Sequence, residues 1–486
     1  MKGGLRLATV RGISWTGLAQ GTGYLVTVGA LGLAARYLRP RDFGAEAAVA
    51  VVVGIWVIAA DLGLGRALVQ RRDLTPSHLA AALWIGLITS CFSAVLLWQT
   101  ARFWSRLFFD DQVATILPTM GWGLVCAGVG AVPRAQMERA FRFGQLAVID
   151  LCASLLGGGT LVALALLDYG VWSLVWGYVV RSGVLGVGPW MFCPAVGRYR
   201  FVLQDAKDLL GFGTKWVGSR LVGYAQQNVD YLLIGRLLGS GALGYYSLAY
   251  RLIAFPQVRL VQAVSRVTFP AFSALQTDLP RLRGAYLSTI TYIALLVFPI
   301  MAGFYVLADS VIVLVYGEGK ALAGGILQLL WPAGAVRAVA SPVGLIFSSL
   351  GRTGLALIWN IGAALFMLGA VRAGVVGGVE GVALAVSLGA VALAGVSQAI
   401  VNRIVALRFG DYLRALRPAA VCSAVMVGGV GFHRWLLAGQ LPDLALVATC
   451  VVLGGCVYLL ALRLLARETS REALDLARLL WKRAEE

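Results

Sequence analysis

The chain has 486 residues, of which 59% are apolar and only 13% are Asp, Glu, Lys or Arg. A soluble fold could not cover its surface with so few charges, because an ordinary globular domain has about 25%. The net charge of +18 does not indicate nucleic-acid binding, since the basic residues lie in short segments between apolar runs. Anionic lipid headgroups are the simpler partner.

The hydropathy pattern predicts an all-α polytopic membrane protein with about fourteen transmembrane helices. The mean hydropathy is +0.81, and stretches long enough to cross a bilayer recur along the whole chain. A basic segment precedes the first stretch without a cleavage motif, so we expect an uncleaved first helix. The expected spans cover approximately residues 13–35, 44–69, 79–98, 115–132, 146–167, 171–191, 211–235, 243–269, 285–308, 325–348, 354–371, 379–401, 418–437 and 444–465.

The distribution of basic residues predicts the orientation of these spans. With the N-terminus in the cytoplasm, 25 Lys and Arg residues fall in cytoplasmic segments and nine fall on the opposite side. Since cytoplasmic loops carry the excess of positive charge, both termini are expected inside.

An internal repeat predicts how the spans are grouped. The segment from Arg36 to Gly44 recurs 200 residues later, from Arg236 to Gly244. Because the offset spans six helices, an even number, two six-helix bundles should share one orientation and be related by a pseudo-two-fold axis along the membrane normal. A chance match between glycine-rich apolar segments is the alternative.

The repeat also sets the expected domain boundaries, with two C-terminal helices left outside it. The last segment has helical apolar spacing among basic residues, and is either an amphipathic helix on the inner leaflet or a solvated helix. The expected parts are an N-terminal lobe (1–197), a cytoplasmic interfacial linker (198–210), a C-terminal lobe (211–408), two extra helices (409–465) and a cytoplasmic tail (466–486).

Seven basic residues lie inside predicted spans. A central arginine that faces lipid costs about 3 kcal/mol. Arg66 and Arg266 lie near inner ends and can extend to the interface, which favours a structural role, although Arg66 is also a cavity candidate. The seven residues are Arg66, Arg181, Arg220, Arg251, Arg259, Arg266 and Arg337.

Four of these arginines lie deeper, all in the second half: Arg220, Arg251, Arg259 and Arg337. Asp61 and Asp230 are candidate counter-charges, and two acids for four arginines leave the interior electropositive. We therefore predict a water-filled cavity with a basic lining that binds an anionic group such as phosphate. The alternative is that some arginines bond backbone carbonyls or lie at the ends of kinked helices.

Other polar side chains are expected near this cavity. Tyr224 and Tyr250 share helices with the deep arginines and could line it, as could Tyr246. Asp230, with Asn360 in the middle of a later span, could hold Na⁺ or a proton. A salt bridge from Asp230 to a neighbouring arginine is the other interpretation.

No sequence motif indicates catalysis. There is no Walker-type loop, and His78 and His433 both lie at span ends. The pair Asp110-Asp111 stands alone and is interpreted as loop acid near the interface. The seven cysteines are interpreted as packing residues, with no metal site and no cofactor other than a coupling ion, Na⁺ or H⁺.

Four stretches carry a family resemblance: ARYLRPRDFG at 35–44, DLGL at 61–64, QNVDYLLIGRLLG at 227–239 and ALGYYSLA at 242–249. The chain resembles bacterial polysaccharide-export flippases, the Wzx-type members of the multidrug/oligosaccharidyl-lipid/polysaccharide exporter superfamily. The likeness extends over nearly the whole chain, and none of these motifs is catalytic.

This resemblance implies a transporter and not an enzyme. The implied cargo is an undecaprenyl-pyrophosphate-linked oligosaccharide, which crosses the bacterial plasma membrane through a V-shaped cavity by alternating access, often driven by an ion gradient. Arg220, Arg251 and Arg259 would contact pyrophosphate or acidic sugars, and Asp61 and Asp230 would serve pairing or ion coupling. A polysaccharide polymerase and glycosyltransferases are candidate partners.

Three rival functions remain. A cation/drug antiporter of the same superfamily should have an acidic cavity, which the excess of arginine disfavours. A membrane glycosyltransferase or polymerase would need a large extracytoplasmic loop with paired acids or histidines, and the sequence has none. In a non-transporting scaffold, the deep charges would have no role.

Overall fold

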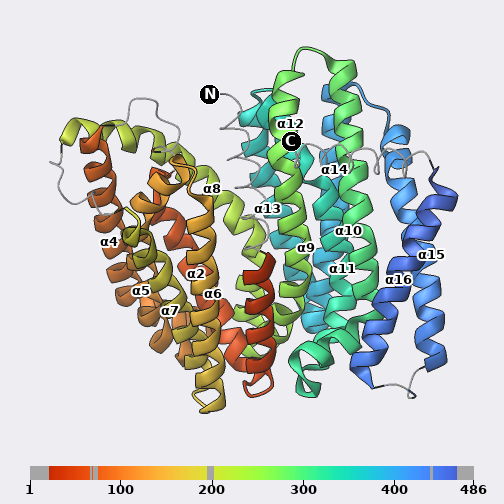
Figure 1. Cartoon of the computed structure of the whole chain (residues 1–486), viewed down its shortest axis with the longest axis horizontal. Helices are drawn as coiled ribbons and strands as arrows, with labels where there is room; N and C mark the ends of the chain where they lie inside the picture. Colours follow the sequence, from red (N-terminus) through yellow and green to blue (C-terminus); the bar gives the residue numbers. More distant parts are fainter. Residues whose placement is uncertain are drawn as a thin grey trace. The chain divides into compact units, whose positions relative to one another are not determined.

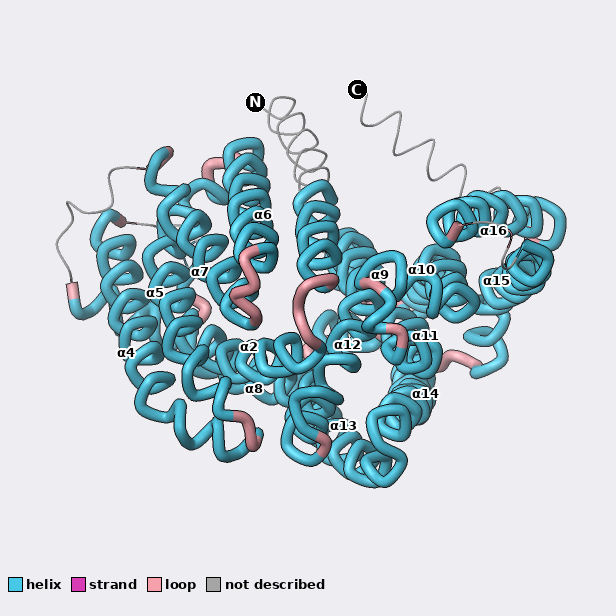
Figure 2. Tube along the Cα trace, turned by 90° about the horizontal axis from the view of Figure 1, so that it is seen from below, coloured by secondary structure: helices cyan, strands magenta, loops and turns pink. Residues whose placement is uncertain are grey.

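The computed structural model describes residues 21–65, 68, 75–193, 202–437, 440 and 442–467. These residues form helices joined by short connections, and Figure 2 shows helix and loop as their only classes. The chain divides into two compact units, Met1–Gly244 and Tyr245–Glu485. The expectation of an all-α, multi-pass membrane protein is confirmed.

The helices of the first unit are coloured from red to yellow-green in Figure 1. A helix over Gly21–Ala35 precedes them. The others are α2 (Pro40–Asp61), α4 (Pro76–Phe108), α5 (Asp111–Arg139), α6 (Phe143–Leu166), α7 (Val171–Val187) with a short 3₁₀ turn at Gly188–Met191, and α8 (Leu203–Leu237).

The second unit contains most of α9 (Gly239–Ala274) and the helices that follow it (Figure 1). These are α10 (Leu279–Tyr316), α11 (Leu322–Ala340), α12 (Pro342–Ser349), α13 (Thr353–Gly374), α14 (Gly378–Val405), α15 (Phe409–Leu437) and α16 (Asp443–Leu465). Every predicted span overlaps at least one of the helices in the described part of the chain. Ten helical segments there are long and apolar enough to cross a membrane.

Local sequence explains where several helices begin. Proline occupies the first position of α2 and of α4, where its missing N–H has no helical partner to lose. The Thr75 side chain accepts a hydrogen bond from the His78 N–H and so caps α4. Asp110 caps α5 and Asp278 caps α10 in the same way. These polar residues end the connections and set the register of the apolar helices.

Glycines let the helices within each unit approach closely. A Cβ at Gly157 in α6 would lie 2.8 Å from the Gly177 carbonyl oxygen in α7. A Cβ at Gly130 in α5 would lie 2.7 Å from the Leu185 carbonyl oxygen in α7. Backbone contact of this kind replaces the hydrophobic effect as the source of helix association in a bilayer.

Buried polar side chains connect the helices of the second unit. The Tyr286 hydroxyl in α10 donates to Gln398 Oε1 in α14 at 2.8 Å, and Gln398 Nε2 donates to Asn402 at 2.9 Å. The Tyr458 hydroxyl in α16 donates to the Leu295 carbonyl at 2.9 Å. Such bonds satisfy groups that would otherwise be desolvated without partners.

The compact units and the predicted lobes divide the chain at different places. Helix α8 packs on α2 and α4, so the first unit extends to Gly244, whereas the repeat places the second lobe from residue 211. Residues 203–210 of the expected linker form the start of α8. The lobe boundaries, the axis and the arrangement of twelve helices plus two stay predictions, and residues 468–486 of the tail lie outside the described residues.

Candidate functional site

The structure distributes the predicted site residues over both units. Asp61 ends α2, whereas Arg220, Tyr224 and Asp230 lie on α8 in the first unit. In the second unit α9 carries Tyr250, Arg251 and Arg259, α11 carries Arg337 and α13 carries Asn360. Arg66 and the side chains of Arg259 and Arg266 lie outside the described residues.

The clearest grouping of predicted residues is in the second unit, where Arg337 meets Tyr250. Arg337 Nη1 donates a hydrogen bond to the Tyr250 hydroxyl oxygen at 3.0 Å. The Tyr250 ring stacks on that of Tyr246 one helical turn away, with 6.0 Å between centroids and 23° between planes. Because Tyr246 is fully buried, this stack fixes Tyr250, and Tyr250 in turn orients the guanidinium.

Arg337 lies close to the middle of the apolar segment Leu322–Ser349. Its side chain is half-buried, as is that of Arg251, which follows Tyr250 on α9. A guanidinium held in a partly desolvated place can bind phosphate or carboxylate oxygens in a two-pronged geometry. The pair of Arg337 and Tyr250 is therefore suited to an anionic ligand.

Tyr224 has a packing partner in the first unit. Its hydroxyl donates to the carbonyl oxygens of Val51 and Ala50 in α2, at 3.2 and 3.4 Å. A Cβ at Gly54 would overlap this hydroxyl, so a glycine is needed where α8 meets α2. These contacts account for Tyr224 without a ligand, and a role in lining the cavity stays a prediction.

Asp230 is buried, with 2% of its surface exposed. Its Oδ1 accepts a hydrogen bond from the Tyr231 N–H at 3.0 Å. The amide of the nearby Asn228 donates to the Tyr224 carbonyl at 2.8 Å, so it is used by the backbone of its own helix. Arg220 is exposed and Asn360 is half-buried. Ion coupling through Asp61, Asp230 or Asn360 stays a prediction.

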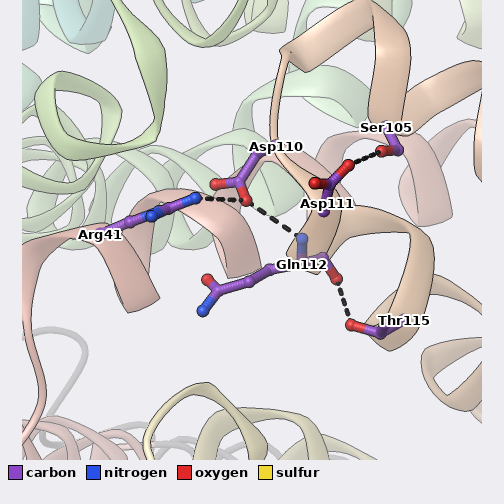
Figure 3. A network of polar contacts seen from close by, with 6 residues as sticks. All are labelled: Arg41, Ser105, Asp110, Asp111, Gln112 and Thr115. Atoms are coloured by element: carbon purple, nitrogen blue, oxygen red, sulfur yellow. Dashed lines mark hydrogen bonds and ion pairs between the residues drawn. The ribbon is translucent and has the colours of Figure 1, made fainter.

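A polar network that the sequence did not predict joins α2 to the turn between α4 and α5 (Figure 3). Arg41 Nη2 donates to Asp110 Oδ1 at 3.1 Å, and the Gln112 N–H donates to the same oxygen at 3.1 Å. The Asp110 side chain is 2% exposed and that of Arg41 is 59% exposed. Asp110 is thus both the cap of α5 and a buried partner for Arg41, and not only an acid at the interface.

The Arg236 segment of the repeat binds the same turn. Arg236 Nη1 donates to the carbonyl oxygens of Leu107 and Arg106 at 2.9 and 3.2 Å, and its guanidinium lies 4.2 Å from the Phe109 ring centroid. These carbonyls end α4 and have no helical N–H partner, so a cation is favoured there. Both copies of the repeat therefore contact the α4–α5 turn.

The two repeated glycines face each other within the first unit. A Cβ at Gly44 would lie 2.6 Å from the Ser240 carbonyl carbon, and one at Gly244 would lie 2.6 Å from that of Pro40. The contact is reciprocal, because each glycine meets the residue four positions before the other. It places the start of α2 in backbone contact with the start of α9.

Removing Arg41 should destabilise the protein because the Asp110 carboxylate would remain buried without its cation. We expect Arg41→Ala to cost about 1–3 kcal/mol, the usual penalty for a buried polar group that loses its partner. Adding Asp110→Asn should recover most of this loss, since the amide oxygen can still cap α5 without a charge. Thermal unfolding of the purified protein in detergent measures both, and a double variant no more stable than Arg41→Ala would contradict the expectation.

Comparison with known proteins connects this chain to polysaccharide biosynthesis. The family model described as "Polysaccharide biosynthesis protein" matches residues 33–319. The chain is 24% identical to the lipopolysaccharide biosynthesis protein WzxC of Escherichia coli (strain K12), covering 92% of this chain and 87% of that protein. It is 26% identical to the succinoglycan biosynthesis transport protein ExoT of Rhizobium meliloti (strain 1021), covering 96% and 95%.

Other similarities are partial or concern the fold alone. The teichuronic acid biosynthesis protein TuaB of Bacillus subtilis (strain 168) is 28% identical over 63% of this chain, and the match spans 64% of TuaB. The lipid II flippase MurJ, in an inward closed conformation, matches 93% of this chain and 99% of its own with a TM-score of 0.75 and 14% identity. An inward-facing multidrug transporter of the MATE family matches 78% and 94% with a TM-score of 0.59 and 18% identity.

Proposed function

This chain belongs to the polysaccharide biosynthesis protein family, and we propose that it is a flippase for an undecaprenyl-pyrophosphate-linked oligosaccharide. The observation that carries the proposal is the position of Arg337, which lies near the middle of an apolar segment and is hydrogen-bonded to Tyr250. Charged side chains at that depth are rare and mark substrate or ion pathways, where they face water, a counter-charge or the cargo. The names of the relatives support the class of cargo, and the shared fold supports a transporter.

The physical task of such a flippase is to carry the polar head of a lipid across hydrocarbon. Sugar hydroxyls and phosphates lose their hydration there, at a cost of several kcal/mol for each unpaired group. Side chains such as Arg337 and Tyr250 would replace that hydration, while the polyprenyl tail stays in lipid. Alternating access would then open the site first to the cytoplasm and then to the other side, with Na⁺ or H⁺ as the driving ion.

In this proposal the protein is a transporter and not an enzyme, and it lies in the bacterial plasma membrane with both termini in the cytoplasm. The excess of basic residues on the side of the termini supports that orientation and favours anionic lipids as neighbours. A polysaccharide polymerase and glycosyltransferases are the proteins that would supply and use the cargo.

A cation/drug antiporter is the second candidate, because the chain shares its fold with a MATE transporter. Reconstitution separates the two. In proteoliposomes, a lipid-linked oligosaccharide with a fluorescent label should become accessible to an impermeant quencher beyond the share that faces outward initially. Protein-free liposomes provide the baseline. Movement of an organic cation such as ethidium with no movement of the labelled lipid would overturn the flippase.

Two of the deep arginines provide a direct test of the basic cavity. We expect Arg220→Ala and Arg259→Ala each to abolish flipping without lowering the amount of folded protein, because each removes a charge that the cargo needs. The matched control is Arg414→Ala, since the Arg414 side chain is 80% exposed and pairs only with Asp411 three residues away among the described residues. Unchanged flipping in both test variants would remove the basic-cavity assignment.

A further inference from the structure

One deep arginine, Arg181, has no part in the site described so far. It is the middle residue of the segment Val171–Met191, about 15 Å from either end at 1.5 Å per residue. That distance is further than an arginine side chain reaches, so the Arg181 guanidinium cannot extend to either end of the segment. Arg181 is nevertheless exposed, and among the described residues no hydrogen bond or ion pair engages its guanidinium.

The direction in which Arg181 leaves its helix argues against lipid. Trp176 and Val187, 45% and 62% exposed, mark the open side of α7. Arg181 lies about 140° around the helix from Trp176 and about 120° from Val187, at 100° per residue. Its neighbours on that side, Leu174 and Gly177, are buried. The side chain therefore emerges among packed residues, where its charge requires water or a polar ligand.

Small residues make room for this side chain and fix its neighbour. A Cβ at Gly157 in α6 would lie 2.7 Å from the Arg181 Cβ. The close packing of α6 on α7 therefore requires glycine at position 157. The Tyr178 ring, one turn before Arg181, lies over Gly123 of α5, where a Cβ would be 2.6 Å from the hydroxyl. Ser182 lies one turn after Tyr178 on α7, close enough to act on the Tyr178 hydroxyl. Arg181 is thus flanked on its own helix by Tyr178, which packing holds in place, and by Ser182.

A carboxylate completes the group. Glu46 of α2 is close enough to act electrostatically on Tyr178, as Arg181 does. The two helices start side by side, because a Cβ at Gly170 would lie 3.9 Å from Asp42 Oδ1. Glu46 lies about 9 Å along α2 from its first residue, and Tyr178 lies about 10 Å along α7 from its first residue. The two side chains are therefore at a similar depth.

We infer that Arg181, Tyr178, Ser182 and Glu46 form a subsite in the first unit for a sugar of the cargo that bears a carboxylate. This inference rests on the proposed function. A carboxylate group would accept hydrogen bonds from the Arg181 guanidinium. Sugar hydroxyls, which both donate and accept, would bond to the Glu46 carboxylate and to the hydroxyls. A pyrophosphate offers only acceptors and cannot donate to the Glu46 carboxylate, so it fits this set less well.

The test compares two cargoes in proteoliposomes: a lipid-linked oligosaccharide with one uronic acid, and the same molecule with that carboxyl reduced to an alcohol. For the unaltered protein we expect faster flipping of the acidic cargo. Arg181→Gln should slow the acidic cargo about tenfold, the loss expected for one charge-assisted pair, and leave the reduced cargo unchanged. Arg181→Lys keeps the charge but not the planar guanidinium, so its rate for the acidic cargo should lie between those of the unaltered protein and Arg181→Gln. It replaces the glutamine variant in the test if that variant folds poorly.

Each result decides the inference. Equal slowing of both cargoes would show a structural role, and no slowing of either would show no role, so both overturn the subsite. An unaltered protein that flips neither cargo would instead contradict the proposed function itself.

Water access gives a second readout that does not depend on transport. In a background with the seven native cysteines replaced, Arg181→Cys should react with a charged, aqueous thiol reagent, whereas Trp176→Cys should not. An unreactive cysteine at position 181 would mean a dry or lipid-facing site and would overturn the inference.

Discussion

Replacing Gly44 by alanine is expected to prevent the first unit from reaching its native packing. The new Cβ would lie 2.6 Å from the Ser240 carbonyl carbon and 3.0 Å from the Gly244 nitrogen. Both are backbone atoms at the start of α9, so the clash cannot be relieved by rotation of a side chain. The cost should exceed the 1–3 kcal/mol that is typical of overpacking, and the fraction of protein that elutes as a single folded species in detergent should fall sharply.

The chain provides a matched control for this substitution. Gly241 lies in the same segment as Ser240 and Gly244, and a Cβ there would meet nothing within 4 Å. We expect Gly241→Ala to leave folding unchanged, because the residue has ordinary backbone angles and open space. Equal folded fractions for Gly44→Ala and Gly241→Ala would mean that the close approach is not needed.

Replacing Arg337 by alanine is expected to remove most transport while the protein still folds. A charged hydrogen-bonding group contributes about 1.5–3 kcal/mol, so losing its interaction with the transition state should slow flipping about ten- to a hundredfold. Arg337→Lys should recover part of the rate, because lysine keeps the charge but not the planar fork. Initial rates in proteoliposomes, normalised to folded protein, measure both.

Tyr250→Phe separates orientation from charge in the same site. The phenylalanine keeps the ring that stacks on Tyr246 and loses only the hydroxyl that accepts from Arg337. We expect a smaller loss than for Arg337→Ala, since the guanidinium stays in place with more freedom. A rate for Arg337→Ala equal to that of the unaltered protein would exclude Arg337 from the path of the cargo.

Much of the fold follows from local sequence. The apolar lengths predict the helices, and Pro40, Pro76 and Thr75 mark where two of them start. The repeat predicts that residues around Gly44 and Gly244 are equivalent. These features can be recognised because a helix and its cap depend on residues a few positions apart.

The site was less predictable because its contacts join distant parts of the chain. Tyr224 bonds carbonyls more than 170 positions away, and a carbonyl acceptor leaves no mark in a sequence. Asp110 looked like a loop acid, since its partner Arg41 is 69 positions away. Arg181 was recognised as an in-span charge, but the exposure of Trp176 and Val187 and the close approach of Gly157 were needed to show which side of α7 it occupies.

The reciprocal meeting of Gly44 and Gly244 has a consequence for how such a chain could arise. Contact between equivalent residues on both sides is what a two-fold axis produces in a homodimer. Two separate half-length copies could pair through this segment, and one mutation would then alter both faces together. Once the copies are fused, each face can diverge alone, so that one half can gain arginines such as Arg337 without imposing them on the other.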